Sequence, residues 1–181
     1  MILRKATYED LEQIVELANA VKLNYDNPQK DGFIVYVLDS EQYQLRIENS
    51  GLFYVAEQDK EIIGYLMCYS NEEFDKLYSL GELDHEDQLT ETIFNKPGKF
   101  VFGDHIAVKL GSNYHGVGKS LMNRLFFDLQ KENISLMYVG VLEKPVKNIT
   151  SKRFVTSLGF QKEVSITNKD KTQWGIYYVR I

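Results

Sequence analysis

The sequence has little of several features that would mark a specialised class of protein. It contains one cysteine, Cys68, which cannot form a disulfide within the chain and has no second cysteine nearby to complete a metal or redox pair. Its longest apolar run, 33–38, is far shorter than the roughly 20 residues needed to cross a bilayer. No apolar segment followed by a cleavage site opens the chain. We therefore expect a cytoplasmic protein that does not enter a membrane.

The chain also lacks an excess of positive charge. Its 181 residues include 21 Lys and Arg against 26 Asp and Glu, for a net charge of −5 and a pI near 5.3. Nucleic-acid binding depends on clustered basic residues that displace counterions from phosphates, so we expect no nucleic-acid partner. Hydrophobic residues make up 44% of the chain, enough for a core in a domain of this length. These numbers predict a single domain over residues 1–181.

Hydrophobic periodicity predicts an α/β fold built on one mixed sheet. Strands are expected at 2–6, 52–57, 62–69, 100–108, 136–142, 160–167 and 174–180. Thr7 and Asp10 resemble a capping box that opens a first helix, and Ser40 is the predicted N-cap of a second. Further helices are expected at 116–132 and 148–158. Because the helix at 116–132 lies between two strands, the parallel part of the sheet is predicted there.

The segment 70–99 carries the whole charge imbalance of the chain. It holds eight acidic residues and three lysines, for a net charge of −5. Apart from a helical turn around 72–80 it shows little periodicity, and so long an insertion in a compact domain indicates a functional flap or a mobile loop. Adjacent acidic residues in such a loop are more often solvated than metal-bound, so we predict no metal. The acidic cluster comprises Glu82, Asp84, His85, Glu86 and Asp87.

A glycine-containing loop between a strand and a helix is the most informative segment. Gly116 and Gly118 let a ligand approach the backbone closely, and the first turn of the following helix offers unpaired N–H groups and the positive end of its dipole. This arrangement suits a phosphate. Asn113 stands where a P-loop needs glycine, and Leu121 replaces the third glycine of a dinucleotide fingerprint, so neither motif fits. Glycines that serve packing alone are the structural alternative.

Two motifs at their expected spacing resemble the GNAT superfamily of acetyltransferases. Residues 113–118, Asn-Tyr-His-Gly-Val-Gly, resemble the pyrophosphate loop Gln/Arg-x-x-Gly-x-Gly/Ala, with Asn113 in place of Gln or Arg. Residues 148–160 resemble the later block Asn-x-x-Ala-x-x-Phe-Tyr-x-x-x-Gly-Phe. The resemblance covers nearly the whole chain except the acidic insertion. It implies a mixed, mostly antiparallel sheet of about seven strands flanked by about four helices, in which the fourth and fifth strands splay apart.

The resemblance implies that the protein binds acetyl-CoA as its acetyl donor. The pyrophosphate is expected on the amides of residues 114–120, and the pantetheine arm along the backbone of residues 106–108. Lys119 and His115 either contact the phosphates or point to solvent. Asn148 lines the far side of the cofactor by resemblance, although it also suits an N-cap. The full cofactor-binding set is Ile106, Ala107, Val108, Asn113, Tyr114, His115, Gly116, Val117, Gly118, Lys119, Ser120, Asn148, Ser151 and Phe154.

Acetyl transfer to an amine needs a group that removes a proton from the ammonium. Side chains alternate along a strand, so Asp104 is expected to share a face with Phe102 and Ile106, the face that carries the base in members with a base on this strand. His105 is then expected on the other face. We prefer Asp104 to His105 as the catalytic residue, although a bulge in the strand would change which side chains share a face. For either residue, a structural hydrogen bond within the sheet is the alternative role.

One further residue departs from the family pattern. Val155 stands where many members carry the tyrosine that protonates the departing CoA. A thiol with a pKa of about 8.5 can leave as the anion, so the substitution does not exclude catalysis.

The predicted reaction transfers an acetyl group from acetyl-CoA to a primary amine of a small molecule or peptide by direct attack. The acidic segment 70–99 is expected to border the acceptor site, which favours a cationic amine. Two alternatives stay open. One is a catalytically inactive domain that binds acyl-CoA as a sensor or scaffold, and the other is a loop at Gly116 that holds a different phosphate ligand. The sequence does not distinguish a monomer from a homodimer.

Overall fold

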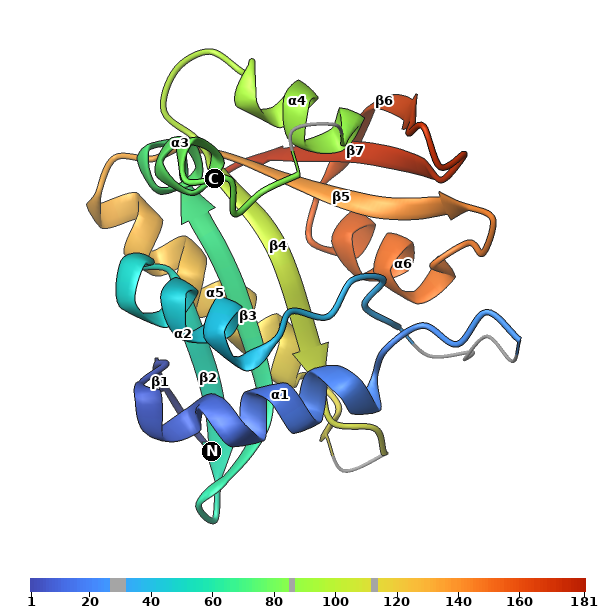
Figure 1. Ribbon diagram of the computed structural model, residues 1–181. Coiled ribbons are helices and arrows are strands. Elements are labelled where there is room, and N and C mark those ends of the chain that lie inside the picture. Colours follow the sequence, from blue (N-terminus) through green and yellow to red (C-terminus); the bar gives the residue numbers. More distant parts are fainter. Residues whose placement is uncertain (27–31, 85–86, 112–113) are drawn as a thin grey trace.

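A computed structural model describes residues 1–26, 32–84, 87–111 and 114–181 (Figure 1). It contains a seven-stranded sheet in the order β1-β2-β3-β4-β5-β7-β6. All neighbouring strands are antiparallel except β4 and β5, which are parallel, so the predicted mixed and mostly antiparallel sheet is confirmed. The strands are β1 (Ile2–Lys5), β2 (Phe53–Gln58), β3 (Glu61–Ser70), β4 (Val101–Val108), β5 (Leu136–Lys144), β6 (Gln161–Thr167) and β7 (Gln173–Arg180).

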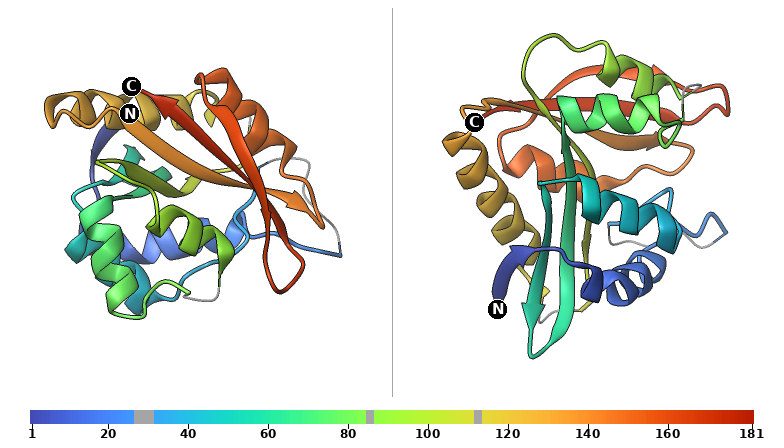
Figure 2. Two further views of the ribbon diagram at one scale, coloured as in Figure 1. Left: turned by 90° about the horizontal axis from the view of Figure 1, so that it is seen from above. Right: turned by 60° about the vertical axis from the view of Figure 1, so that its left-hand side comes forward.

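Helices cover both faces of the sheet, and each face has its own hydrophobic core. The helices are the 3-10 turn η1 (Tyr8–Asp10), α1 (Leu11–Ala20), α2 (Ser40–Asn49), α3 (Asn71–Ser79), α4 (Gln88–Phe94), α5 (Val117–Lys131) and α6 (Ile149–Ser157). Buried side chains of α1, α2, α3 and α4 pack on one face, and those of α5 and α6 pack on the other (Figure 2). No helix of the described residues is long and apolar enough to cross a membrane.

The acidic insertion is folded against this framework. The predicted turn around 72–80 is the full helix α3, and α4 is a second helix that the weak periodicity did not predict. Phe74, Leu77 and Ile93 are buried in the core. Tyr78 and Phe94 stack with ring centroids 4.2 Å apart, which joins the two helices. The insertion therefore forms part of the wall on the α2 side of the sheet (Figure 1).

Capping contacts fix where the first two helices begin. The predicted box at Thr7 is present, since the Asp10 carboxylate accepts the Thr7 backbone N–H at 2.8 Å. The predicted N-cap at Ser40 is wrong by one residue. Asp39 accepts the Gln42 N–H at 2.8 Å, and Gln42 Oε1 accepts the Asp39 N–H at 3.1 Å. Asp39 is preferred because Gln42, three residues later, completes a reciprocal box.

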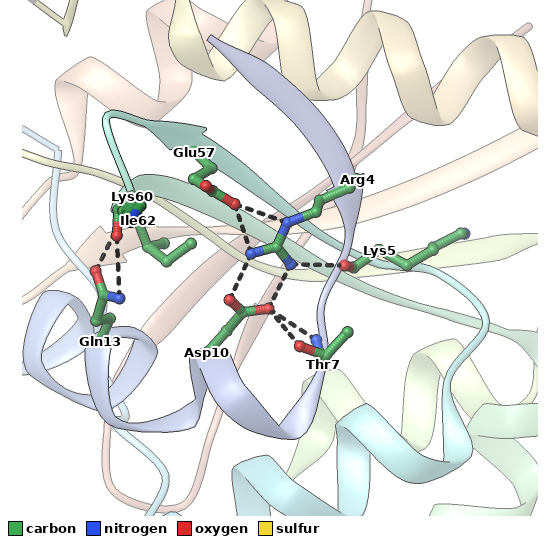
Figure 3. A network of polar contacts seen from close by, with 8 residues as sticks. All are labelled: Arg4, Lys5, Thr7, Asp10, Gln13, Glu57, Lys60 and Ile62. Atoms are coloured by element: carbon green, nitrogen blue, oxygen red, sulfur yellow. Dashed lines mark hydrogen bonds and ion pairs between the residues drawn. The ribbon is translucent and has the colours of Figure 1, made fainter.

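An arginine near the N-terminus ties the first strand to its neighbours (Figure 3). Arg4 donates to both oxygens of Asp10 at 2.6 and 2.7 Å, and its Nε donates to Glu57 at 2.9 Å. These contacts join β1 to η1 and β2. Burial acts to raise the pKa of Asp10, but the hydrogen bonds from Arg4 and Thr7 outweigh it and hold that pKa below its usual value.

Candidate active site

The sheet opens where its two parallel strands part. β4 and β5 pair only through Val101, Phe102 and Gly103, and the described residues beyond these form no further pairs between the two strands. A cavity of about 490 Å³ lies at this opening. The splayed fourth and fifth strands expected from the resemblance are therefore confirmed. Parallel strands that diverge leave backbone groups exposed to a ligand, which makes the edge of β4 a binding surface.

The cavity has an apolar wall and an acidic wall. The apolar wall comes from β4, α5 and α6, and includes Ile106, Met122, Phe154 and Val155. The acidic wall comes from α2 and the segment before it, the insertion, β4, and the start of β7 with the turn before it. Its charged and aromatic members are Tyr36, Arg46, Glu82, Asp84, Asp87, Asp104, Asp170 and Trp174.

A β-bulge in β4 places Asp104 and His105 on the same side of the sheet. Gly103 pairs with Cys68 and His105 pairs with Met67, so Asp104 is an extra residue without a partner in the β3 register. The predicted alternation of side chains holds from Phe102 to Asp104, which share a face, and is wrong from His105 onward. Two residues face one across a bulge, and every later side chain changes face. Ile106 accordingly packs with the α5 core, whereas Phe102 packs in the core on the α2 side.

Asp104 lies at the cavity wall. Its side chain is 27% exposed, and its Oδ2 accepts the Tyr69 hydroxyl at 2.9 Å. Its Oδ1 is 3.9 Å from His105 Nε2. The carboxylate is thus held from one side and open to the cavity on the other.

His105 is more deeply buried than Asp104, with 8% of its side chain exposed. Its Nδ1 lies 3.4 Å from the hydroxyls of both Tyr43 and Tyr65, which are 3.0 Å from each other. Burial lowers the pKa of His105, the Asp104 charge acts to raise it, and the Arg46 charge lowers it further. A neutral, enclosed imidazole is the result, so Asp104 is the better placed of the two predicted catalytic residues to meet an acceptor.

A buried arginine stands behind this pair. Arg46 of α2 is 1% exposed, and it donates through Nη1 to Glu82 Oε2 and through Nη2 to the Glu82 carbonyl, both at 2.8 Å. The ion pair links α2 to the insertion. It also compensates one carboxylate of the acidic wall.

The start of α5 forms the predicted anion cradle only in part. Gly116 has a left-handed φ of 87°, which favours glycine, and N-caps the helix. Among the predicted amides, Tyr114 N–H donates to Gly111 and Ser120 N–H donates to Gly116, so both already have partners within the chain. The first-turn amides of residues 117–119 are the ones that a helix leaves for a ligand. Asn113 lies outside the described residues.

Side chains around the cradle take different roles. Val117 is buried in the core, whereas His115 and Lys119 are exposed. A Cβ at Gly118 would lie 3.4 Å from Phe154 and 3.5 Å from Ile106. Gly118 is therefore the point where the first turn of α5 meets two other predicted cofactor-binding residues.

Asn148 has the structural role that its sequence position allowed. Its Oδ1 accepts the Ser151 N–H at 3.0 Å and caps α6, and its Nδ2 donates to the Phe33 carbonyl at 2.9 Å. Asn148, Ser151 and Phe154 all line the cavity, as does buried Val155. The structure thus brings together Ile106, Asn148, Ser151 and Phe154 from the predicted set.

Sequence reasoning missed several residues in and behind the acidic wall. Tyr69 lies in a continuous apolar run, and Arg46 in a short polar helix, so neither carried a local signal. Trp174 is 9% exposed and lines the cavity. Its ring stacks on Tyr36 at 6.2 Å between centroids. Among the described residues, no group of three or more His, Cys, Asp or Glu is placed to hold a metal ion.

Comparison with known families identifies the class of this chain. Residues 12–160 match the acetyltransferase (GNAT) family, and the chain therefore belongs to that family. The family uses acetyl-CoA as its acetyl donor. A search of curated proteins gives no match to the sequence.

Solved structures share the fold over almost their whole length. The apo form of an agmatine N-acetyltransferase mutant is 12% identical with a TM-score of 0.68, and the match covers 99% of both chains. The ribosomal-protein-alanine N-acetyltransferase from Brucella melitensis is 15% identical with a TM-score of 0.65, with 100% of both chains covered. A chain of the NatC complex bound to Gag peptide and CoA is 12% identical with a TM-score of 0.65, covering 99% of this chain and 98% of that one.

Proposed function

We propose that this protein transfers the acetyl group of acetyl-CoA to a primary amine of a small cationic acceptor. The observation that carries the proposal is the cavity between β4 and β5, which has a cofactor-type wall on one side and an acidic wall on the other. Asp104 of the acidic wall lies on β4, two residues before Ile106 of the apolar wall. Direct attack within a complex of both substrates suits a single cavity with two walls, because it brings the amine and the thioester into contact.

The apolar wall fits the donor. The first-turn amides of α5 suit the pyrophosphate, and the backbone of residues 106–108 along the open edge of β4 suits the amide groups of the pantetheine arm. The absence of a side chain at Gly118 leaves the backbone there accessible. When bound, acetyl-CoA supplies the thioester carbonyl that the amine attacks.

The acidic wall fits a positively charged acceptor. Five carboxylates line the cavity, and Arg46, paired with Glu82, is the one cation among the described lining residues. Tyr36 and Trp174 stack beside Asp170, whose Oδ2 lies 3.4 Å from the Tyr36 hydroxyl. Hydrogen bonds from Thr172 hold the pKa of Asp170 below its usual value, so this carboxylate stays ionised. Aromatic rings next to a carboxylate bind ammonium and guanidinium groups.

Asp104 is the proposed base. An amine reaches the cavity as an ammonium ion, and Asp104 takes one of its protons so that the nitrogen lone pair attacks the carbonyl carbon. The C–S bond then breaks with the electron pair on sulfur, and the acylated nitrogen releases its second proton to water. Val155 has no proton to give, and the thiolate leaves as the anion before it takes a proton from water. Neutral His105 stays beside Asp104 and adds no positive charge against the ammonium.

Calorimetric titration with acetyl-CoA tests the donor half of this proposal. Binding in the micromolar range is expected for the parent, a loss of more than tenfold for Gly118→Glu, and a smaller loss for Gly118→Gln, which has nearly the same size without the charge. Equal losses in the two variants would assign Gly118 to packing alone. A parent that prefers another phosphate compound to CoA would overturn the donor assignment.

Steady-state rates with a diamine, a guanidino amine, a peptide with a free N-terminus and a monoamine that carries no second charge test the acceptor half. We expect the diamine and the guanidino amine to give the highest kcat/KM. Preference for the peptide would change the proposed acceptor class to peptides, and preference for the monoamine would overturn the role of the acidic wall. Acyl-CoA binding without turnover of any amine would favour the sensor or scaffold alternative.

A further inference from the structure

The carboxylate of Asp104 is restrained from the neighbouring strand. Tyr69 of β3 donates its hydroxyl to Asp104 Oδ2 at 2.9 Å. Tyr69 is fully buried, whereas Asp104 is partly exposed at the cavity wall. The donor is therefore fixed by packing, and the acceptor is a side chain that would otherwise rotate. A hydrogen bond to a charged group is among the stronger single contacts in a protein, so it selects one orientation of the carboxylate.

The bulge makes this restraint necessary. Phe102 pairs with Tyr69, and Gly103 pairs with Cys68, but Asp104 has no residue opposite it in the register. A residue at a bulge lacks the cross-strand neighbour that normally limits its side chain. Tyr69 lies on β3 opposite Phe102, two residues before Asp104, and its hydroxyl supplies that limit.

Arg46 of α2 lines the same cavity as Asp104 and is fixed by the insertion. Burial acts to lower the pKa of Arg46, but its interactions with Tyr69 and Glu82, together with the Asp104 charge, outweigh it and raise that pKa. The guanidinium is thus a permanent charge among the residues that line the cavity. Its Nη atoms are held by Glu82 at 2.8 Å, while its Nε has no hydrogen-bond partner among the described residues.

We infer that Tyr69 is a positioning residue that holds the Asp104 carboxylate toward the acceptor. The inference rests on the proposed function, in which Asp104 takes the proton. Tyr69 acts through Asp104 and does not touch the reacting atoms.

Other titratable groups share the surroundings of Asp104, so the test must isolate Tyr69 from them. Those on β3, α2 and β4 that interact electrostatically with Asp104 are Tyr65, Cys68, Tyr43, Arg46 and His105. Replacing the Tyr69 hydroxyl alone leaves all of these groups in place.

Tyr69→Phe removes the hydroxyl and keeps the ring. The expected result is a decrease of roughly tenfold in kcat/KM for the amine at pH 7, with an unchanged affinity for acetyl-CoA. The loss should appear in kcat, with KM for the amine little changed, because a base that is not held in position slows proton transfer rather than acceptor binding. Tyr54→Phe is the matched control. Tyr54 is also fully buried, donates to Asp128 Oδ2 at 3.1 Å, and lies on the α5 face, so its loss should leave kcat/KM unchanged.

A double-mutant cycle separates positioning from a general structural effect. If Tyr69 acts through Asp104, then adding Tyr69→Phe to Asp104→Asn should cost no further activity. Equal losses from Tyr69→Phe in the two backgrounds would overturn the inference. Full parental activity of Asp104→Asn would overturn the base assignment in the proposed function.

A measurement without turnover tests the restraint by itself. Crystal structures of the parent, Tyr69→Phe and Tyr54→Phe show the orientation of the Asp104 carboxylate directly. We expect one orientation in the parent and in Tyr54→Phe, and a rotated or divided carboxylate in Tyr69→Phe. An unchanged carboxylate in Tyr69→Phe overturns the inference even for an active enzyme, and a rotated one supports it even where none of the tested amines is turned over.

Discussion

Two arginines, Arg4 of β1 and Arg46 of α2, each form ion pairs with carboxylates but differ in how completely their guanidinium groups are hydrogen-bonded. Arg4 is one-third exposed and directs both Nη atoms and its Nε to the carboxylates of Asp10 and Glu57. Arg46 is 1% exposed, pairs with Glu82 through its Nη atoms, and leaves Nε without a partner among the described residues. The Arg4 network is outside the cavity lining, whereas Arg46 and Glu82 form part of it.

These contrasts separate a network that serves the fold from one that serves the site. A fully bonded guanidinium at a strand edge gains all the stability its geometry allows. A buried guanidinium with an unsatisfied N–H destabilises the fold, and such groups are found mainly where the charge also has a functional role. Arg46 lines the same cavity as Asp104, the group that we assign to proton transfer. We therefore predict that changes near Arg4 act on stability and that changes near Arg46 act on both stability and rate.

The largest effect should come from the carboxylates of the two networks. Asp104→Asn should lower kcat by roughly 100- to 1,000-fold, since removal of a general base commonly costs that much, with little change in unfolding midpoint. Asp10→Asn should leave kcat unchanged for folded protein and lower the free energy of unfolding by about 2 kcal/mol, because two arginine hydrogen bonds to a charged acceptor are lost. Steady-state rates and urea unfolding of both variants check this. A lower kcat in folded Asp10→Asn would remove the division between the networks.

The second prediction concerns the arginines themselves. Arg46→Met should lower the free energy of unfolding by about 3 kcal/mol, because Glu82 is left without its partner in a largely buried position. Arg4→Met should cost about 1 kcal/mol, because its ion pairs are closer to solvent. Urea unfolding at neutral pH gives both values. Equal losses would mean that the depth of burial does not distinguish the two networks.

Much of this arrangement could be predicted from the sequence. The order of the strands, and of the helices other than α4, followed from periodicity, and the motif at residues 113–118 located the start of α5 beside the apolar wall. The position of the bulge at Asp104 could not be predicted, because one extra residue leaves no trace in the local pattern and yet moves His105 to the face that carries Asp104. The contacts of Arg46 were also out of reach. They join residues far apart in the sequence, and only tertiary packing brings Glu82 to α2.

Acid should weaken the Arg4 network in a defined range of pH. Since the folded pKa of Asp10 lies below its usual value, its contribution to stability is present above about pH 4 and is lost as the pH falls through that folded pKa. Asp10→Asn removes this contribution at every pH. We therefore expect the parent and the variant to differ by about 2 kcal/mol at pH 7 and to converge as the pH falls through the folded pKa of Asp10. Urea unfolding at pH 7, 5, 4, 3 and 2 measures the difference, and a constant gap over this whole range would contradict the assignment.

The smallest expected effect lies at the far end of the acidic wall and asks whether charge there acts on the acceptor or only on the fold. Asp170 is exposed beside Tyr36 and Trp174, so Asp170→Asn should raise KM for a dicationic amine about three- to fivefold, as expected for one solvent-screened ion pair. The substitution should leave kcat unchanged, and it should also leave KM unchanged for a monoamine that carries no second charge. Asp75→Asn is the control, because Asp75 carries the same charge on α3 outside the cavity lining. A similar rise in both variants would mean that the acidic wall attracts cations through its summed field, whereas a rise in Asp170→Asn alone would mark a local contact with the second charge of the acceptor.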